Sequence, residues 1–233
     1  MRRYMIGLLV IPAIITISCS RSTAPDNGDN TPPPPQYTVN GVFEMEAIIA
    51  NYRSPVFSID GAIITLNDTL GQSISSATVV VNGDTIPYTG IYLDTVNVRY
   101  VAGYEYTLSV YIDSLNNLTA TVQAPDVDSI RILSPALGDT LPYDSLTLQW
   151  EYYGNPATGT TYILVADTMI EVSGTSYTLD STLVKNILAQ RQTDNLMVGV
   201  LIMNGIYFPE LVEGSSFFVG TGRATGVIVD TTR

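Results

Sequence analysis

Two glutamates, Glu44 and Glu46, stand two positions apart in the segment "GVFEMEAII". Residues two apart on a strand share a face, which would hold their carboxylates roughly 6.5 to 9.5 Å apart, the separation found in inverting glycoside hydrolases. The alternation has a simpler explanation, because the glutamates form the polar half of a strand whose apolar half runs from Phe43 to Ile49. The pattern indicates no cleft and nothing that would raise one pKa. We therefore expect no catalytic residue, and a carboxylate-based glycan hydrolase stays only as a third alternative.

Asp126 and Asp128 form a second carboxylate pair, in the segment "APDVDS". Clustered loop carboxylates can bind calcium, but a solvated linker between two domains explains this pair without an ion. The segment "DNGDN" at 26–30 has the look of a calcium loop, yet it lacks the distal acidic ligand of an EF-hand. We expect neither a metal site nor a cofactor.

A glycine-rich stretch, "GTGRATG" at 220–226, superficially resembles a phosphate-binding loop. No helix follows it, so the amide-lined anion site of such loops would be missing. We interpret the stretch as a bulged or flexible end of the last strand.

Tyrosine is plentiful, with fifteen tyrosines against five phenylalanines. Tyrosine is favoured on recognition surfaces, although it is also a good strand former. The tyrosines near loops are candidates for a protein or glycan contact, but the sequence identifies no ligand-binding residue. These tyrosines are Tyr52, Tyr92, Tyr152 and Tyr153.

Composition excludes several kinds of chemistry. The chain of 233 residues has no histidine and one cysteine, so the commonest general base and the usual zinc ligands are missing. Its formal net charge is -12, so we expect no basic surface that could bind the phosphates of nucleic acid.

The N-terminus has the plan of a secretory signal. Arg2 and Arg3 precede an apolar run from Met5 to Ile17, which is short for a permanent membrane span. "TISC" at 16–19 resembles the lipobox of bacterial lipoproteins, and this resemblance implies cleavage before Cys19 and lipid attachment to it. The same resemblance implies an outer-membrane anchor in a cell with two membranes, because Ser20 follows the cysteine where an aspartate would imply inner-membrane retention. The alternative is an ordinary signal peptide with a chance cysteine.

The next segment, 19–36, is rich in proline, serine and asparagine and includes four consecutive prolines. Such a composition favours an extended stalk without a core of its own. We therefore divide the chain into a signal peptide (1–18), a lipid-anchored linker (19–36), a first β-sandwich (37–125) and a second β-sandwich (126–233).

Strands dominate both predicted domains. Apolar residues alternate with polar ones in short runs separated by turn signals such as "VNGD" at 81–84, a pattern typical of β-sandwiches. One helix is expected after Asp180 or Ser181, because Leu183, Val184, Ile187 and Leu188 share a helical face. The predicted fold is all-β, with two tandem sandwiches and one short helix in the second.

The second domain resembles a fibronectin type III or related immunoglobulin-like domain from about 126 to 222. The similarity lies in "SPALGDTLP" at 134–142, the strand "LTLQW", the strand "TYILV" and "TSYTL" at 175–179. By this resemblance, Trp150 matches the family's core tryptophan and Tyr162 lies on the strand that follows it. The usual tyrosine is absent from "LMVGVLI" at 196–202. Such domains host many functions, so the resemblance implies a fold and no activity.

The first domain resembles, more loosely, a carboxypeptidase-regulatory or transthyretin-like sandwich, through "SSATVVVNGD" at 75–84, "GYEYTLSV" at 103–110 and "TATVQAP" at 119–125.

We expect a non-enzymatic protein of the bacterial cell envelope, anchored through lipid on Cys19, that presents sandwich modules for binding or adhesion to a protein or glycan, with no nucleic-acid partner. The alternative is a docking subunit of an envelope complex, which a large exposed apolar patch would favour.

Overall fold

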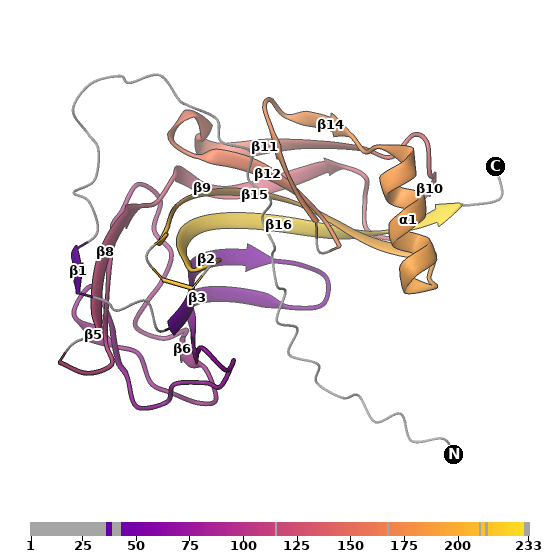
Figure 1. Cartoon of the computed structure of the whole chain (residues 1–233). Coiled ribbons are helices and arrows are strands. Elements are labelled where there is room, and N and C mark those ends of the chain that lie inside the picture. Colours follow the sequence, from indigo (N-terminus) through magenta and orange to yellow (C-terminus); the bar gives the residue numbers. More distant parts are fainter. Residues whose placement is uncertain are drawn as a thin grey trace, which may run out of the picture.

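The computed structural model describes residues 36–38, 43–114, 116–166, 168–209, 211–212 and 214–230. The predicted signal peptide, Cys19 and nearly all of the predicted stalk lie outside them. Within these residues the fold is built from three β-sheets and one short helix, which confirms the expected all-β class (Figure 1).

The sheets have five, eight and three strands. The five-stranded sheet has the order β1-β8-β7-β4-β5, with β1 (Gln36–Thr38), β4 (Thr78–Val81), β5 (Asp84–Thr85), β7 (Glu105–Tyr111) and β8 (Asn117–Gln123). The eight-stranded sheet has the order β13-β12-β15-β16-β2-β3-β6, and β10 also pairs with β16. Its strands are β2 (Phe43–Arg53), β3 (Ser58–Asp68), β6 (Tyr92–Asp94), β10 (Thr140–Pro142), β12 (Thr160–Val165), β13 (Thr168–Val172), β15 (Asn195–Tyr207) and β16 (Ser216–Asp230).

The three-stranded sheet has the order β14-β11-β9, with β9 (Asp126–Ser134), β11 (Thr147–Asn155) and β14 (Ser176–Thr178). A 3-10 turn, η1 (Pro156–Thr158), follows β11. β9 begins at Asp126, so Asp126 and Asp128 lie on a strand and not in the solvated linker expected for them. Val127 is fully buried there and anchors the start of the strand.

Turn chemistry fixes the hairpin that joins β4 to β5. Asn82 and Gly83 both have positive φ, at 50° and 94°, a conformation that Asn and Gly adopt at low cost. The Asn82 side chain also accepts a hydrogen bond from the Thr107 backbone N–H at 2.7 Å. This side-chain contact ties the hairpin to β7.

The first hydrophobic core lies between the five-stranded sheet and one half of the eight-stranded sheet. The predicted apolar half of β2 is fully buried in it. Residues from the other end of the chain complete this core, namely Phe208, Leu211, Phe217 and Val219. The first sandwich therefore includes the chain's last two strands.

The second core lies between the three-stranded sheet and the other half of the eight-stranded sheet. Trp150, predicted as a core residue, is 2% exposed and packs edge-on against Tyr152. Helix α1 (Ser181–Arg191) closes this core with Val184, Ile187 and Leu188. Asp180, one of the two residues expected to cap the helix, is the N-cap. Its carboxylate accepts a hydrogen bond from the Leu183 N–H at 2.9 Å.

The two sandwiches share β15 and β16. β15 pairs with β16 along the whole length of β15, and the first half of β16 also pairs in parallel with β2, from Ser216 opposite Glu46 to Arg223 opposite Arg53. In Figure 1, β16 is the long curved yellow strand beside β2. The division of the chain at 125/126 stays a prediction, but the two segments are joined by this parallel pairing.

Polar groups separate the two cores along the shared strands. The Asn204 side-chain amide donates to the carbonyl oxygens of Gln123 and Thr158, at 2.9 and 2.8 Å. The Thr221 hydroxyl donates to the Asn51 carbonyl at 2.9 Å. These bonds satisfy polar groups at the place where the chain passes from one sandwich to the other.

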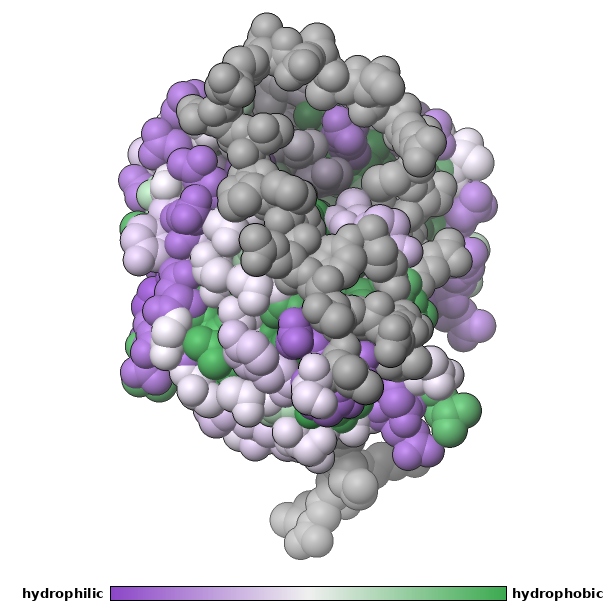
Figure 2. Space-filling view, turned by 60° about the vertical axis from the view of Figure 1, so that its left-hand side comes forward, coloured by the Kyte–Doolittle hydropathy of each residue, from purple (hydrophilic) through white to green (hydrophobic). Residues whose placement is uncertain are grey.

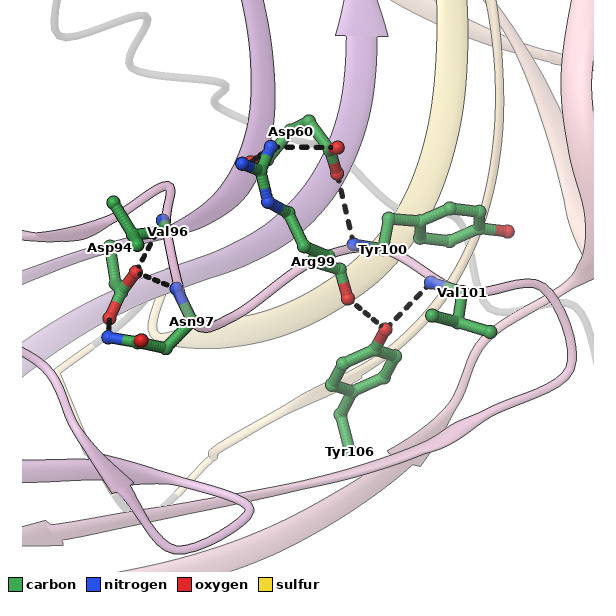
Figure 3. A network of polar contacts seen from close by, with 8 residues as sticks. All are labelled: Asp60, Asp94, Val96, Asn97, Arg99, Tyr100, Val101 and Tyr106. Carbon is green, nitrogen blue, oxygen red and sulfur yellow. Dashed lines mark hydrogen bonds and ion pairs between the residues drawn. The ribbon is translucent and has the colours of Figure 1, made fainter.

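Figure 3 shows the polar network that fixes the loop after β6. The Asp94 carboxylate accepts from the backbone N–H groups of Val96 and Asn97, at 2.7 and 2.8 Å. Burial alone would raise the pKa of Asp94, but these hydrogen bonds outweigh burial and hold the pKa below its usual value. The Tyr106 hydroxyl donates to the Arg99 carbonyl and accepts from the Val101 N–H, which pins the same loop to β7.

The loop also reaches the junction between the sandwiches. The Asp60 carboxylate accepts from the Tyr100 N–H at 3.1 Å and pairs with Arg99 at 3.1 Å (Figure 3). The buried Tyr100 hydroxyl lies 2.9 Å from the Pro125 carbonyl and 3.0 Å from that of Val127, and it can donate to either. The network is therefore structural, because its groups are occupied by one another and by the backbone.

Candidate functional site: the outer face of the eight-stranded sheet

Glu44 and Glu46 lie on the side of the eight-stranded sheet that faces away from both cores. Both are half-buried, and the Glu44 carboxylate lies 3.4 Å from the side-chain amide nitrogen of Asn67 on β3. Burial raises the pKa of Glu46, and the charge of Glu44 raises it further. The expectation that nothing raises either pKa was wrong, because the sequence could not show how much apolar surface surrounds these carboxylates.

Asp126 and Asp128 both lie on β9 and are exposed. The Asp126 N–H donates to the Thr158 hydroxyl at 2.7 Å, which ties the start of β9 to η1. In the part of the chain that the structure describes, no group of three or more His, Cys, Asp or Glu side chains is placed to hold a metal ion. No described helix has the length and apolar character needed to cross a bilayer.

The four tyrosines noted near loops have different environments. Tyr92 is a core residue, 2% exposed, with its hydroxyl 2.9 Å from the Ile74 carbonyl. The Tyr152 hydroxyl bonds that of Thr161 at 2.7 Å, and Tyr153 is exposed on the three-stranded sheet. Only Tyr52 belongs to the outward side of the eight-stranded sheet.

We define the outer face as the side of the eight-stranded sheet opposite the two cores. The strand registers are continuous, so residues that alternate with the core positions lie on this side. The described residues place both cores on the other side and supply no second layer here. The larger outer-face residues are Glu44, Glu46, Ile48, Tyr52, Ile59, Ile63, Tyr162, Leu164, Met169, Glu171, Met197, Leu201, Met203, Tyr207, Phe218 and Ile228.

Glycines stand beside the large side chains of the outer face. Gly222 pairs with Leu201 on one side and Tyr52 on the other. A Cβ added at Gly222 would lie 2.3 Å from Leu201 Cδ2 and 2.8 Å from Tyr52 Cδ2, so both side chains lie across the glycine. Phe218 covers Gly205 in the same way, at 2.0 Å from a Cβ built there. Cross-strand packing of large side chains on glycine stabilises such sheets and leaves a low, flat apolar surface.

This packing explains the stretch at 220–226. The segment lies in the middle of β16 as regular strand, and Gly220, Gly222 and Ala224 are buried there. A Cβ at Gly220 would lie 2.3 Å from the backbone oxygen of Ile202. The interpretation as a flexible or bulged end was wrong, because these glycines are required by the bulk of the neighbouring strands.

The outer face is nevertheless accessible. Ile48 is 40% exposed and Tyr207 is 44% exposed, and Tyr207 packs edge-on against Phe218. Tyr52 is the exception, since it is buried and its hydroxyl has no hydrogen-bond partner among the described residues. Burial raises its pKa to about 12. An unpaired buried hydroxyl costs about 1 to 3 kcal/mol, so a polar partner at this position would stabilise the protein.

The outward side of the five-stranded sheet has the opposite character. Hydroxyl groups pair across its strands, Thr107 with Thr121 at 2.9 Å and Ser109 with Thr119 at 3.2 Å. Figure 2, which brings this side of the molecule forward, shows mostly purple and pale residues, with green ones in separate groups. A shallow hollow there is lined by Asn82, Tyr104, Glu105 and other residues of β4 and β7.

Comparisons with known proteins identify no family. No protein-family model matches the chain, and no curated protein matches it. Among solved structures, the fibronectin(III)-like modules of Clostridium thermocellum CbhA match 80% of this chain and 94% of theirs, at 10% identity and a TM-score of 0.26. Immunoglobulin domains 1–4 of Sidekick-1 match 84% of this chain at 10% identity and a TM-score of 0.22, and the match covers 49% of that structure. These are distant similarities to fibronectin III-like and immunoglobulin-like β-domains, so the candidate site depends on the chain's own geometry.

One feature of the sequence indicated an apolar outer face, although the search for alternating strands missed it. In β15, "NLMVGVLIMNGIY", apolar residues and glycine occupy both sides of the strand. Strands that are apolar on both sides are typical of sheets covered on both faces. Ile48, which occupies the polar half of β2, extends the same signal across the sheet.

Proposed function

We propose that this protein is a non-enzymatic, lipid-anchored protein of the bacterial cell envelope that docks on another envelope protein through the outer face. The observation that supports docking is the apolar, glycine-flattened outer face, over which the described residues place no sheet or helix. Exposed apolar patches of this extent mark interaction sites on soluble domains. The anchor is supported by the resemblance of 16–19 to a lipobox. In this proposal Cys19 is the lipidated residue, and the outer membrane is the membrane that holds the protein.

The anchor is tested by the intact mass of the protein recovered from native membranes. We expect a chain that begins at Cys19 and carries the added mass of acyl chains, and a Cys19→Ala variant without that mass. The variant should leave the membrane fraction, because acyl chains supply the membrane affinity. An unmodified natural chain released to the medium would contradict the anchor.

Docking is tested separately by a single charge placed in the outer face. Ile48→Arg should release the protein from its assembly in mild detergent extracts, because an unpaired charge in an apolar interface costs about 2 kcal/mol or more, or roughly 30-fold in affinity. Sedimentation then compares the variant with the natural chain. Tyr111→Arg is the matched control, since Tyr111 is 49% exposed on the five-stranded sheet and should leave the assembly intact.

The hollow on the five-stranded sheet supports a second candidate, binding or adhesion to a glycan. Tyr104 is 52% exposed there beside Glu105 and Asn82, and an aromatic ring with polar neighbours suits a sugar. Glycan-array binding that Tyr104→Ala abolishes and Ile48→Arg preserves would favour this candidate over docking.

A further inference from the structure

The charges on the outer face are all of one sign. Its carboxylates are Glu44 and Glu46 on β2, Glu171 on β13 and Asp230 at the end of β16, and none of its positions is lysine or arginine. The sheet between them is apolar and includes three methionines, whose flexible side chains adapt to a partner's shape. The face therefore has an apolar centre and an acidic rim.

The size of the face matches a protein interface. Five neighbouring strands at about 4.8 Å spacing, with about eight residues each at roughly 3.3 Å, span roughly 600 Å². Stable protein complexes bury about 800 Å² on each partner. The face therefore reaches about three quarters of the area that one partner buries in a standard interface, which is the small end of the range for specific complexes.

We infer that the occupant of the outer face is a different protein whose docking surface has an apolar centre bordered by lysine or arginine. This inference rests on the proposed docking function and names the chemistry of its partner. A basic rim on the partner would pair with these carboxylates of the outer face.

Two other occupants fit the charges less well. A second copy of this chain would bring the acidic rim against an identical acidic rim, and like charges across an interface are unfavourable. An anionic membrane surface would repel the same carboxylates. Both remain outcomes of the experiment below.

The experiment places a photo-reactive phenylalanine analogue at Ile48 of the full-length chain in its native envelope. Irradiation links it to whatever covers the outer face, and mass spectrometry identifies the adduct and the linked peptide. The test variant combines Glu44→Lys, Glu46→Lys and Glu171→Lys. The control variant combines Asp84→Lys, Asp128→Lys and Asp144→Lys, which changes the net charge equally at exposed positions away from the outer face.

We expect an adduct with one other protein, whose linked peptide carries lysine or arginine beside apolar residues. Its yield should fall at least 10-fold in the test variant and stay unchanged in the control variant. An adduct of twice the chain's mass, or an adduct with lipid, would overturn the inference. A protein adduct that survives charge reversal would overturn the basic rim and leave docking intact, whereas no adduct at Ile48 would count against docking itself.

Discussion

The five-stranded and eight-stranded sheets share the same alternation of buried and outward residues, but the outward side of the first is polar and that of the second is apolar. Each sheet buries alternate residues in a core, as in β7 and β2. The remaining residues of β7 and β8 pair their hydroxyls with one another. The outward residues of β2, β15 and β16 are largely apolar, and the large ones pack over glycines of the neighbouring strands. Alternation therefore identifies the core side of a strand, while the composition of the other half identifies what that half contacts.

The difference also separates two uses of glycine. Gly83 has positive φ and serves a turn, and nothing lies within 4 Å of a Cβ built on it. Gly220 and Gly222 have no such backbone requirement and are needed for space. Glycine in the first role allows the chain to turn, and in the second it leaves room for the large side chains of neighbouring strands.

The largest expected effect comes from filling that space. Gly220→Ala should lower the free energy of unfolding by about 3 kcal/mol, because its Cβ would lie 2.3 Å from the backbone oxygen of Ile202 and the strands must separate. Gly226→Ala on the same strand is the control, since its nearest neighbour would be 3.5 Å away. Urea denaturation of the two variants measures the difference. Equal stabilities would show that the outer face tolerates bulk and is not tightly packed.

A smaller effect separates paired from unpaired tyrosine hydroxyls. Tyr92→Phe should cost about 1 kcal/mol, because the hydroxyl that reaches the carbonyls of Ile74 and Ala77 is lost. Tyr52→Phe in the purified protein should cost nothing or stabilise it, since its hydroxyl has no partner among the described residues. Thermal unfolding compares them. A loss at Tyr52 as large as that at Tyr92 would mean that the hydroxyl is already satisfied in the free protein.

The smallest effect is the pH dependence contributed by Glu46. Burial, and then Glu44, raises its folded-state pKa, so the unfolded chain holds this charge more easily and the folded state is penalised above that pKa. Glu46→Gln should therefore stabilise the protein at neutral pH, and the gain should vanish as pH falls below the ordinary glutamate value of 4.5. Glu46→Asp keeps the carboxylate and should keep the pH dependence. A gain that persists at pH 3 would exclude the titration of Glu46 as its cause.

Local chemistry predicted much of this fold. Asp180 as a helix cap, the turn at Asn82 and the burial of Trp150 all depend on residues close in sequence or on strong residue preferences. The parallel pairing of β16 with β2 could not be predicted in this way, since it joins residues about 170 positions apart, as the Met45 N–H and Ser215 hydroxyl bond shows. The outer face depends on that pairing, because only the assembled sheet brings Tyr52, Leu201 and Phe218 together.

The central claim is that a partner covers the outer face in the envelope, and the most direct test is thiol labelling at matched positions. Ile48→Cys probes the outer face, at 40% exposure, and Tyr111→Cys probes the five-stranded sheet, at 49%. Because the natural chain has one cysteine, Cys19, the unsubstituted protein gives the background. We predict that a maleimide labels Ile48→Cys at least 10-fold more slowly in native envelopes than in the purified protein, and Tyr111→Cys equally in both. Equal rates at Ile48→Cys in the two settings would contradict the account.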